Sequence, residues 1–440
     1  MARSKALLLI GVAASALALA ACGDNRLPEE AGYGPSPTLP EPKSSWLPTI
    51  KVAKAVGWKE GEKPTPLAGG QVTAFASGLQ HPRWVYELPN GDVLVAESDA
   101  PPKPEDKKGG IRAWVQGLFM ERAGSRTPSA NRISLLRDAD GDGVAEIKSI
   151  YLENLASPFG IALVGDQLYI ANADAVVRVP YVAGETTNSA KPVKVADLPA
   201  GRNHHWTKSL VASADGSRLY VGVGSNSNVA ENGMAEEERR AAVLEIDPQS
   251  GATQLFASGL RNPVGIDWNP ATKELWVSVN ERDEIGDDLV PDYMTSVKRD
   301  GFYGWPYSYY GQIVDKRVEP PQPDLVARAI KPDYALGSHS ASLGLTFAKE
   351  GQLGPRYAAG AFIGQHGSWN RATPVGYRVL FVPFKDGKLA GMPQPILTGF
   401  LNDQGEARGR PVGVLVDRRK GLLVADDVGN VIWRVALPGG

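Results

Sequence analysis

Histidine is scarce in this chain, and its placement suggests chemistry. The five histidines are His81, His204, His205, His339 and His366. Each stands at the start of an apolar segment or in a loop rich in Gly and Ser, rather than inside an apolar strand. A single loop histidine is usually only solvated, but the tandem pair His204-His205, followed by Trp206, is a candidate general base.

Cations stand at equivalent places in other segments. Arg261-Asn262 opens one apolar segment and Arg408-Gly409-Arg410 opens another. An arginine at a segment start often only pairs with a neighbouring carboxylate. Three arginines and an asparagine around one channel instead make a site for a planar anionic ligand, because a guanidinium binds a carboxylate through two parallel hydrogen bonds.

A second kind of chemistry is indicated by the acidic run from Asp138 to Glu146. Asp138, Asp140 and Asp142 alternate with small residues, and the glycines between them permit a sharp turn, as in the first half of an EF-hand loop. The twelfth position of such a loop is Ser149, so the bidentate glutamate is absent there. The run predicts either a structural Ca²⁺ site on the three aspartates or an ordinary hairpin turn.

The elements that must position these residues follow a repeated pattern. A Gly- or Pro-marked start is followed by an apolar strand, a turn containing Asp, Asn or Gly, and a second apolar strand. Each copy supplies about four short strands and cannot bury both faces alone, so the copies must stack radially. The pattern predicts an all-β, six-bladed β-propeller over residues 72–440, rather than two unrelated β-sandwiches. Its copies begin at His81, Ser157, His205, Asn262, Ser342 and Arg410.

The composition agrees with this fold and excludes some functions. The 49 glycines and 34 prolines indicate many tight turns, and 42% hydrophobic residues suffice for a large core. The formal net charge of −2 gives no electrostatic basis for binding nucleic acid. With one cysteine, the chain forms no internal disulfide and no thiolate metal cluster.

The N-terminal region is typical of an exported protein. Residues 1–22 show a basic start, a short apolar run and the sequence Leu19-Ala20-Ala21-Cys22, which resembles the lipobox of bacterial lipoproteins. The alternative is an ordinary secretory signal that contains a cysteine. We expect lipidation at Cys22, a Pro-rich tether with little order over residues 23–71, and a domain in the periplasm or at the cell surface. Its only membrane contact would be the lipid anchor.

Several separated motifs carry a family resemblance. Over about residues 72–437 the chain resembles the PQQ-dependent glucose/sorbosone dehydrogenase family, and most closely its L-sorbosone dehydrogenase branch. The resemblance implies a six-bladed propeller that holds pyrroloquinoline quinone (PQQ) and Ca²⁺ near its axis. The motifs are His204-His205-Trp206-Thr207-Lys208, Leu260-Arg261-Asn262-Pro263-Val264-Gly265, Asn280-Glu281-Arg282-Asp283-Glu284 with Gly286-Asp287-Asp288, Phe302-Tyr303-Gly304-Trp305-Pro306, Gly364-Gln365-His366-Gly367-Ser368-Trp369-Asn370-Arg371 and Gly409-Arg410-Pro411-Val412-Gly413.

The resemblance also implies an activity. Such an enzyme oxidises a sugar, a sugar-derived aldehyde or a polyol by hydride transfer to the quinone, and passes the electrons to an extracytoplasmic acceptor. The catalytic histidine falls at His205, with His204 as the alternative one residue away. Arg261 and Asn262 would contact the quinone end, where Arg261 would also stabilise negative charge on the quinone oxygen. Arg408 and Arg410 would bind the carboxylates of PQQ.

The expected site also includes a metal ion, and it differs from the family pattern at two positions. The family holds Ca²⁺ partly through two adjacent backbone carbonyls, which fall at Arg282 and Asp283. The carboxylate that orients the catalytic histidine in the glucose-oxidising branch is replaced by Ser225, so the orienting group is missing or supplied elsewhere. The cofactor-binding lysine is also absent, and His366 or Arg371 takes its place. We therefore expect a substrate preference different from glucose.

Two other functions stay open at this point. A Ca²⁺-dependent propeller lactonase would need carboxylates converging on the metal and no arginine cage. A non-catalytic surface-binding propeller would need no cofactor site, because a fold alone does not determine function.

Overall fold

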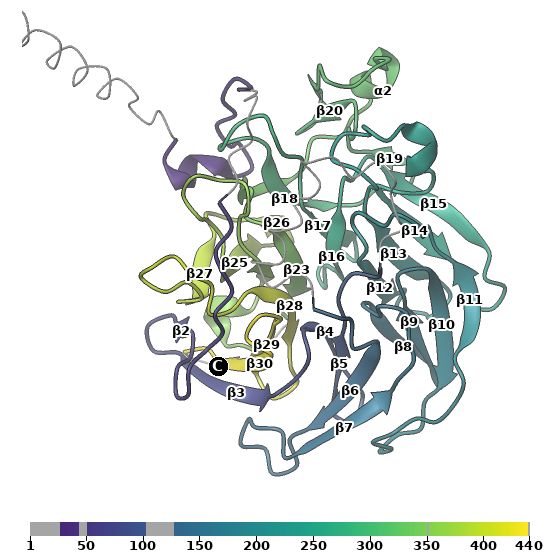
Figure 1. Ribbon diagram of the computed structural model, residues 1–440, viewed down its shortest axis with the longest axis vertical. Helices are drawn as coiled ribbons and strands as arrows, with labels where there is room; N and C mark the ends of the chain where they lie inside the picture. The colour runs from purple at the N-terminus through teal and green to yellow at the C-terminus, as the bar shows by residue number, and fades with distance from the viewer. Residues whose placement is uncertain (1–26, 44–50, 103–126, 350–351, 439–440) are drawn as a thin grey trace, which may run out of the picture.

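The strands of this protein are arranged as six sheets around a common axis (Figure 1). The computed structural model describes residues 27–43, 51–102, 127–349 and 352–438. Within them, each sheet has a core of four antiparallel strands, which form one blade. The predicted all-β, six-bladed β-propeller is confirmed.

The blades follow one another along the chain, and within each blade the strands run in order from the axis outward. The first three are β4 (Pro82–Glu87), β5 (Val93–Glu97), β6 (Arg132–Arg137) and β7 (Ile147–Leu152); β8 (Ile161–Val164), β9 (Gln167–Ala171), β10 (Ala175–Pro180) and β11 (Val193–Asp197); and β12 (Lys208–Ala212), β13 (Leu219–Val223), β14 (Ala242–Ile246) and β15 (Thr253–Ser258). The last three are β16 (Pro263–Trp268), β17 (Leu275–Val279), β18 (Pro291–Ser296) and β22 (Tyr334–Ser338); β23 (Ser342–Phe347), β24 (Gly360–Gln365), β25 (Arg378–Lys385) and β27 (Gln394–Thr398); and β28 (Pro411–Val416), β29 (Gly421–Asp426), β30 (Val431–Ala436) and β3 (Gln71–Ser77).

Short elements decorate this core. The strand β19 (Gly301–Phe302) pairs with β15, β26 (Lys388–Leu389) pairs with β25, and β20 (Ser308–Tyr309) forms a hairpin with β21 (Ile313–Val314). The helix α2 (Pro323–Ala327) and three 3₁₀ turns, η1 (Glu29–Gly32), η2 (Met234–Glu237) and η3 (Pro355–Tyr357), lie in loops.

The innermost strands close a ring, and the repeated sequence pattern explains how. Each of β4, β8, β12, β16, β23 and β28 contacts the next, and β28 contacts β4. The glycine of the repeated motif stands where one inner strand presses on its neighbour. A Cβ at Gly160 would lie 2.3 Å from the amide nitrogen of Leu210, and a Cβ at Gly413 would lie 2.8 Å from the carbonyl oxygen of Arg83. Only glycine allows such close approach of the backbones.

The chain ends meet in the sixth blade. The strand β3, from the N-terminal part, pairs with β30 at the C-terminal end. This pairing closes the ring, because strand hydrogen bonds join the N-terminal and C-terminal parts of the chain within one blade.

The N-terminal segment departs from the tether expected over residues 23–71. Its described parts pack on the propeller and extend two sheets: β1 (Tyr33–Gly34) pairs with β22 of the fourth blade and β2 (Thr65–Pro66) pairs with β27 of the fifth. Between them, Ala53 is buried and Trp58 donates to Asp426 Oδ2 at 2.7 Å. The expectation of little order is wrong for these residues, because extended Pro-rich chain can satisfy its backbone groups on exposed strand edges without any periodicity.

The predicted signal peptide and Cys22 lie outside the described residues. In the described part of the chain, no helix has the length and apolar character needed to cross a membrane.

Candidate functional site

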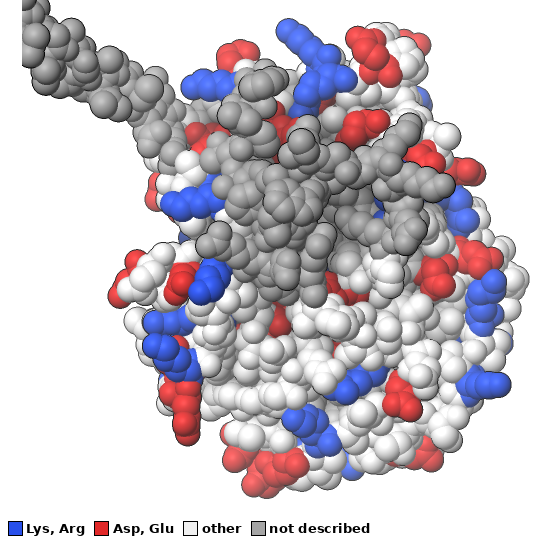
Figure 2. Space-filling model, viewed as in Figure 1, with Lys and Arg blue, Asp and Glu red and all other residues white. Residues whose placement is uncertain are grey.

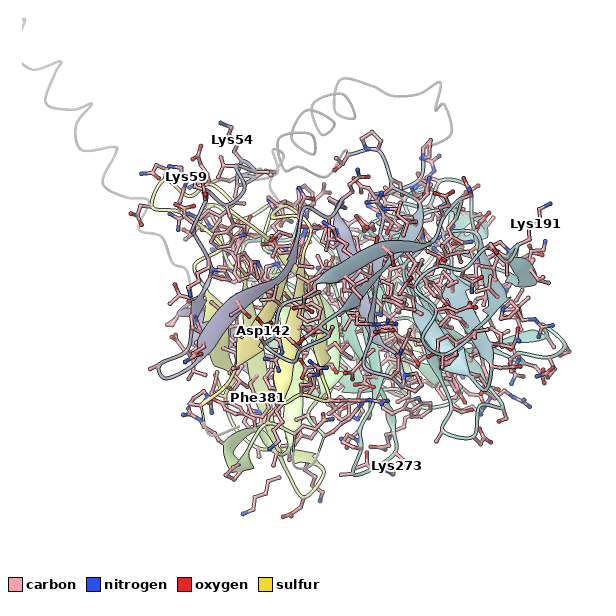
Figure 3. All side chains as sticks on the ribbon, turned by 90° about the horizontal axis from the view of Figure 1, so that it is seen from below. Lys54, Lys59, Asp142, Lys191, Lys273 and Phe381 are labelled. Carbon is pink, nitrogen blue, oxygen red and sulfur yellow. The ribbon has the colours of Figure 1, made fainter. Side chains whose placement is uncertain are left out.

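The candidate residues gather on the face of the propeller where the inner strands begin. His204 and His205 precede β12, Arg261 and Asn262 precede β16, and Arg410 precedes β28. In Figure 3, Lys273, in the turn after β16, and Lys54, in the N-terminal segment, mark opposite faces. The site therefore lies on the face of Lys54.

His205 is fixed by one neighbour, Ser225. Its Nδ1 lies 2.9 Å from the Ser225 carbonyl oxygen and 3.0 Å from Ser225 Oγ. Since Ser225 Oγ donates to the Ser227 carbonyl at 2.7 Å, it has no proton to give to Nδ1. The neutral ring therefore carries its proton on Nδ1, which donates to the Ser225 carbonyl with Oγ as a second acceptor, and its lone pair is on Nε2. Burial and the nearby Arg261 hold the pKa of His205 well below its usual range. A neutral imidazole with a free lone pair on Nε2 can act as a base.

The group that orients His205, expected to be missing or supplied elsewhere, is provided by the backbone at Ser225 itself. A backbone carbonyl replaces the carboxylate, and Ser225 is itself held by Ser227, whose hydroxyl contacts Glu237 Oε1. Glu237 also accepts from the Asn226 amide at 2.7 Å. Sequence alignment can compare side chains only, so it could not find a main-chain orienter.

His204 is placed differently from His205. It is exposed, and its ring meets the edge of the His205 ring at 4.6 Å between centroids. Its amide donates to Asn226 Oδ1 at 3.1 Å. The burial and the fixed tautomer favour His205 as the base.

Arg261 forms the adjoining wall. It is buried and donates to the carbonyls of Asn228 and Glu281 at 3.2 and 2.7 Å, and to Asp283 Oδ2 at 3.3 Å. Asn262 lies next to His205, since a Cβ on Gly224 would be 2.4 Å from Asn262 Oδ1 and 2.5 Å from the His205 Cβ. Arg261 is thus rigidly preoriented, with its charge beside the candidate base.

The predicted metal position gives a mixed result. Arg282 is completely buried in ion pairs with Glu281 and Asp315, both at 3.0 Å, so its side chain supports the fold. The Asp283 carbonyl already accepts from Asn228 Nδ2 at 3.2 Å and Arg317 Nη1 at 3.0 Å. Its carboxylate, rather than its carbonyl, faces the other site residues.

That carboxylate has partners that the sequence reasoning missed. Asp283 Oδ1 lies 2.6 Å from Asn370 Nδ2 and 3.2 Å from His339 Nδ1, and His339 Nε2 lies 2.9 Å from the Gly286 carbonyl. Burial alone would lower the pKa of His339, but Asp283 outweighs it and raises that pKa above its usual value. His339 was noted among the loop histidines, whereas Asn370 stood inside a family motif without a role.

A second cluster surrounds Asp427 across the ring. Its Oδ2 lies 2.5 Å from Arg83 Nη1, 2.8 Å from His366 Nε2 and 3.6 Å from His81 Nε2. Burial lowers the pKa of His366 to about 4 despite this carboxylate. Arg410 adds a further positive charge beside His366 and stacks on the Tyr377 ring at 5.0 Å. Arg83 and Asp427 had no signal in the sequence beyond their place in the repeat.

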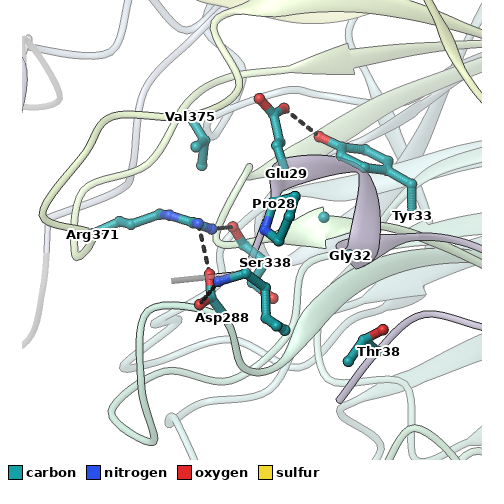
Figure 4. A pocket seen from close by; sticks show the side chains of 11 residues that line it. Pro28, Glu29, Gly32, Tyr33, Thr38, Asp288, Ser338, Arg371 and Val375 are labelled. Carbon is teal, nitrogen blue, oxygen red and sulfur yellow. Dashed lines mark hydrogen bonds and ion pairs between the residues drawn. The ribbon is translucent and has the colours of Figure 1, made fainter. Parts of the chain in front are cut away.

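The remaining predicted cations point elsewhere. Arg408 is partly exposed and pairs with Glu62 of the N-terminal segment at 3.6 Å. Arg371 pairs with Asp288 at 2.7 Å in a small pocket that it shares with Glu29 and Tyr33 (Figure 4). The structure therefore places Arg410 with the buried ring and separates Arg408 from it.

Unsatisfied polar atoms test whether the ring suits the expected cofactor. The buried atoms without a hydrogen-bond partner among the described residues include five in the ring and one in the pocket beside Asp288. Those in the ring are Arg83 Nε, Arg410 Nε, Asn262 Oδ1, Asn370 Oδ1 and Asp427 Oδ1, and the one in the pocket is Arg371 Nε. A buried donor without an acceptor is costly. The two such arginine donors in the ring, on Arg83 and Arg410, fit a ligand that carries several carboxylates, as PQQ does, and the unsatisfied oxygens leave room for donors or a cation beside it.

The acidic run forms a separate group at the other end of the blades, in the turn between β6 and β7. One oxygen each of Asp138, Asp140, Asp142 and Glu146 lies within 4.8 Å of the others. Glu146 supplies the carboxylate that the EF-hand comparison sought at Ser149. Among the described residues this is the one group of three or more His, Cys, Asp or Glu side chains close enough to share a metal, and it stands away from the axis.

Comparison with known proteins places the chain in a family. A family described as a domain of unknown function, DUF7133, matches residues 89–368. The chain belongs to the DUF7133 family. A second family, described as TrAA12-like, matches residues 324–437 of this DUF7133 protein. An uncharacterized protein of Borreliella burgdorferi is 29% identical over 305 residues, which is 66% of this chain and 79% of the relative.

Solved structures resemble this DUF7133 protein in fold. The PQQ domain of pyranose dehydrogenase from Coprinopsis cinerea, in its holo form, aligns with a TM-score of 0.66 at 19% identity over 88% of this chain and 100% of that one. A calcium structure of a family AA12 protein from Trichoderma reesei gives 0.68 at 18% identity over 88% and 98%. The PQQ-bound aldose sugar dehydrogenase of Streptomyces coelicolor gives 0.53 at 17% identity over 84% and 100%. At such identities the likeness establishes the shared propeller.

Proposed function

We propose that this DUF7133 protein is a PQQ-dependent dehydrogenase that oxidises a sugar, a sugar-derived aldehyde or a polyol with the help of Ca²⁺. The observation that carries the proposal is the buried ring around the axis, in which a neutral, oriented His205 stands beside Arg261, and Arg83 and Arg410 hold unsatisfied donors. The likeness in fold to a holo PQQ domain, to a PQQ-bound aldose sugar dehydrogenase and to a calcium structure of a family AA12 protein supports it. The sorbosone branch is the preferred assignment within this class.

The residues have distinct tasks in this proposal. Arg410, Arg83, Asn262 and Arg261 would hold PQQ, and the oxygens of the Asp283 region would hold Ca²⁺. PQQ, when bound, would supply the acceptor for the hydride of the substrate carbon, which carries both electrons. His205 takes the substrate hydroxyl proton at Nε2, while the Ser225 carbonyl stabilises the imidazolium through Nδ1–H. The fixed charge of Arg261 stabilises negative charge that develops nearby.

The alternatives are less well supported by the same geometry. A lactonase needs carboxylates around a metal on the axis, whereas the described carboxylate cluster lies at the β6–β7 turn. A surface-binding propeller gives no reason for buried arginine donors without acceptors.

An activity assay tests the proposal. The protein without its first 22 residues is incubated with PQQ and Ca²⁺, and reduction of an artificial dye is followed with aldoses, polyols and aldehydes. We expect reduction that requires both additions and is abolished by a chelator. Activity that is independent of PQQ, or release of acid from a lactone, would overturn it.

The location is part of the same proposal. We propose that Cys22 carries a lipid and that the enzyme passes electrons to an acceptor outside the cytoplasm. Its described chain starts at Leu27, whose amide donates to Asp288 Oδ2 at 3.1 Å, beside Arg371 on the site face. Five residues span at most about 18 Å, so an anchor at Cys22 would keep this face near the membrane. Cell fractionation of a Cys22→Ala variant would test the anchor.

A further inference from the structure

Lys208 has no role in the chemistry proposed above, although it lies three residues after His205. It is the first residue of β12, and its side chain is 0% exposed. Its Nζ donates to Asn203 Oδ1 at 3.2 Å and to the Trp206 carbonyl at 3.0 Å. These two acceptors flank His204-His205 in the chain. One amino group thus joins both ends of the segment that presents the histidines.

The Asn203 end of this bracket is fixed by further contacts. Asn203 has a φ of +45°, in the left-handed region, and its Nδ2 donates to the Ala173 carbonyl at 3.0 Å. Arg240 Nη2 donates to Asn203 Oδ1 at 3.0 Å, and Arg240 Nη1 donates to the Gly224 carbonyl at 3.4 Å. Gly224 precedes Ser225, which holds the His205 ring. The loop that carries His205 and the strand end that orients it therefore share one network.

The electrostatics of Lys208 indicate that the amino group is there for its hydrogen bonds. Both of its acceptors are neutral oxygens, and burial lowers the pKa of Lys208 well below its usual value, with Arg240 adding repulsion. The charge of Asp174 opposes this lowering without reversing it. Burying an amine whose hydrogen bonds go to neutral oxygens costs stability, and an apolar side chain of similar length could fill the same space. The contribution of Lys208 to packing can therefore be separated from its contribution to the geometry of the loop at residues 203–206.

We propose that Lys208 is a positioning residue that fixes the orientation of the His205 imidazole by bracketing residues 203–206. The hydrogen bond from His205 Nδ1 to the Ser225 carbonyl requires the loop and the end of β13 to stay in register. Loss of the bracket frees the loop to shift, and a displacement of about 1 Å can reduce a rate about 100-fold. The inference rests on the proposed function only for the role given to His205.

Ring-nitrogen NMR tests this orientation without any cofactor. The full chain is labelled with ¹⁵N in its five histidines, so few ring signals are expected. The His205 Nδ1–H signal is assigned by its loss in a His205→Gln variant. We expect a protected signal in the wild type and, in Lys208→Met, exchange with water faster by about tenfold or more.

Two control variants separate orientation from stability. Lys191→Met removes an exposed lysine, and Leu244→Ala creates a cavity in the core of the same blade. Leu244→Ala should lower the melting temperature yet leave the His205 signal protected. If Lys208→Met does not fold, the same measurements are made on Arg240→Met, which removes the hydrogen bonds of Arg240 to Asn203 and Gly224. A folded Lys208→Met or Arg240→Met variant whose His205 Nδ1–H signal is as protected from exchange as in the wild type would overturn the proposal.

Kinetics of the PQQ-loaded enzyme give a second reading. Lys208→Met should reduce kcat about 100-fold while KM and the PQQ dissociation constant change less than about threefold. If the wild type fails to bind PQQ, the proposed function fails, but the NMR result still decides the role of Lys208.

Discussion

His205 is held by Ser225 through a carbonyl at 2.9 Å, and the nearby hydroxyl directs its own proton to Ser227. The geometry proposed for catalysis thus depends on backbone positions at the start of β12 and just after the end of β13, two adjacent strands of one blade. We expect the side chain of Ser225 to contribute little, although its Oγ lies 3.0 Å from Nδ1, because the carbonyl is present whatever residue stands there. Changes to the two residues should therefore differ sharply in their effect.

A pair of substitutions tests this difference. His205→Ala should reduce kcat by about 10²–10⁴-fold through loss of the base, whereas Ser225→Ala should stay within about threefold of the wild type. Steady-state kinetics with saturating PQQ and Ca²⁺ would measure both. An equal loss in the two variants would show that the hydroxyl, not the carbonyl, orients the ring.

The pH dependence of activity follows from the lowered pKa of His205. The base works only when neutral, and burial with the nearby Arg261 holds its folded-state pKa well below 6.5. The rising limb of kcat/KM should therefore lie below pH 6.5, and the rate should be flat from there to neutral pH. A limb centred at pH 7 or above would assign the base to another group.

Residue types and spacing predicted part of this site. His205, Arg261, Asn262 and Arg410 stand where the repeat pattern places the starts of inner strands, and the structure brings them to one face. The carboxylate of Asp427 could not be predicted, because its role depends on contacts from other blades. Arg408 was predicted in the site, but it pairs with Glu62 of the N-terminal segment. This contact could not be predicted, because the segment was expected to be a free tether.

At the scale of elements, the N-terminal segment is part of the propeller. Trp58 packs edge-on against Phe400 and Trp433, with centroids 5.6 and 5.4 Å away, and donates to the buried Asp426. The packing and the hydrogen bond of Trp58 could not be predicted from the sequence, because the N-terminal segment shows no periodicity. The strands of the blades, in contrast, were predictable, because their alternation and turn residues repeat six times.

Trp58→Ala should measure how strongly the segment is attached. The loss of ring packing and of one donor to Asp426 should lower the free energy of unfolding by about 2–3 kcal/mol. Lys59→Ala, at an exposed neighbouring position, should change it by less than about 0.5 kcal/mol. Denaturant unfolding would compare them, and equal small effects would mean that the segment is only loosely associated.

The β6–β7 turn should respond to calcium separately from the central site. With four carboxylates within 4.8 Å of one another, repulsion is relieved by a bound cation. A chelator should lower the melting temperature of the wild type by a few degrees, and an Asp140→Asn/Asp142→Asn variant should lose this response. Calorimetry without PQQ would measure both. A variant that responds like the wild type would place the stabilising ion elsewhere.

At the scale of the whole molecule, six inner strands bring single residues from distant parts of the sequence to one axis. Arg83 and Asp427 are 344 residues apart, yet their side chains form an ion pair at 2.5 Å. The repeat count follows from the sequence pattern, whereas the closure by β3 and the pairing between the first and last blades were found only in the structure. The closed ring as a whole is expected to bind a polyanionic cofactor, and the proposed function depends on this binding.

Direct binding of PQQ tests that expectation. The full chain is titrated with PQQ in the presence of Ca²⁺, and quenching of tryptophan fluorescence is followed for the wild type, Arg410→Ala and Arg408→Ala. We predict saturable binding of one PQQ, weakened about 10–100-fold by Arg410→Ala and little by Arg408→Ala, because Arg408 pairs with Glu62 away from the ring. Absence of saturable binding, or equal effects of the two substitutions, would contradict a cofactor site in the ring.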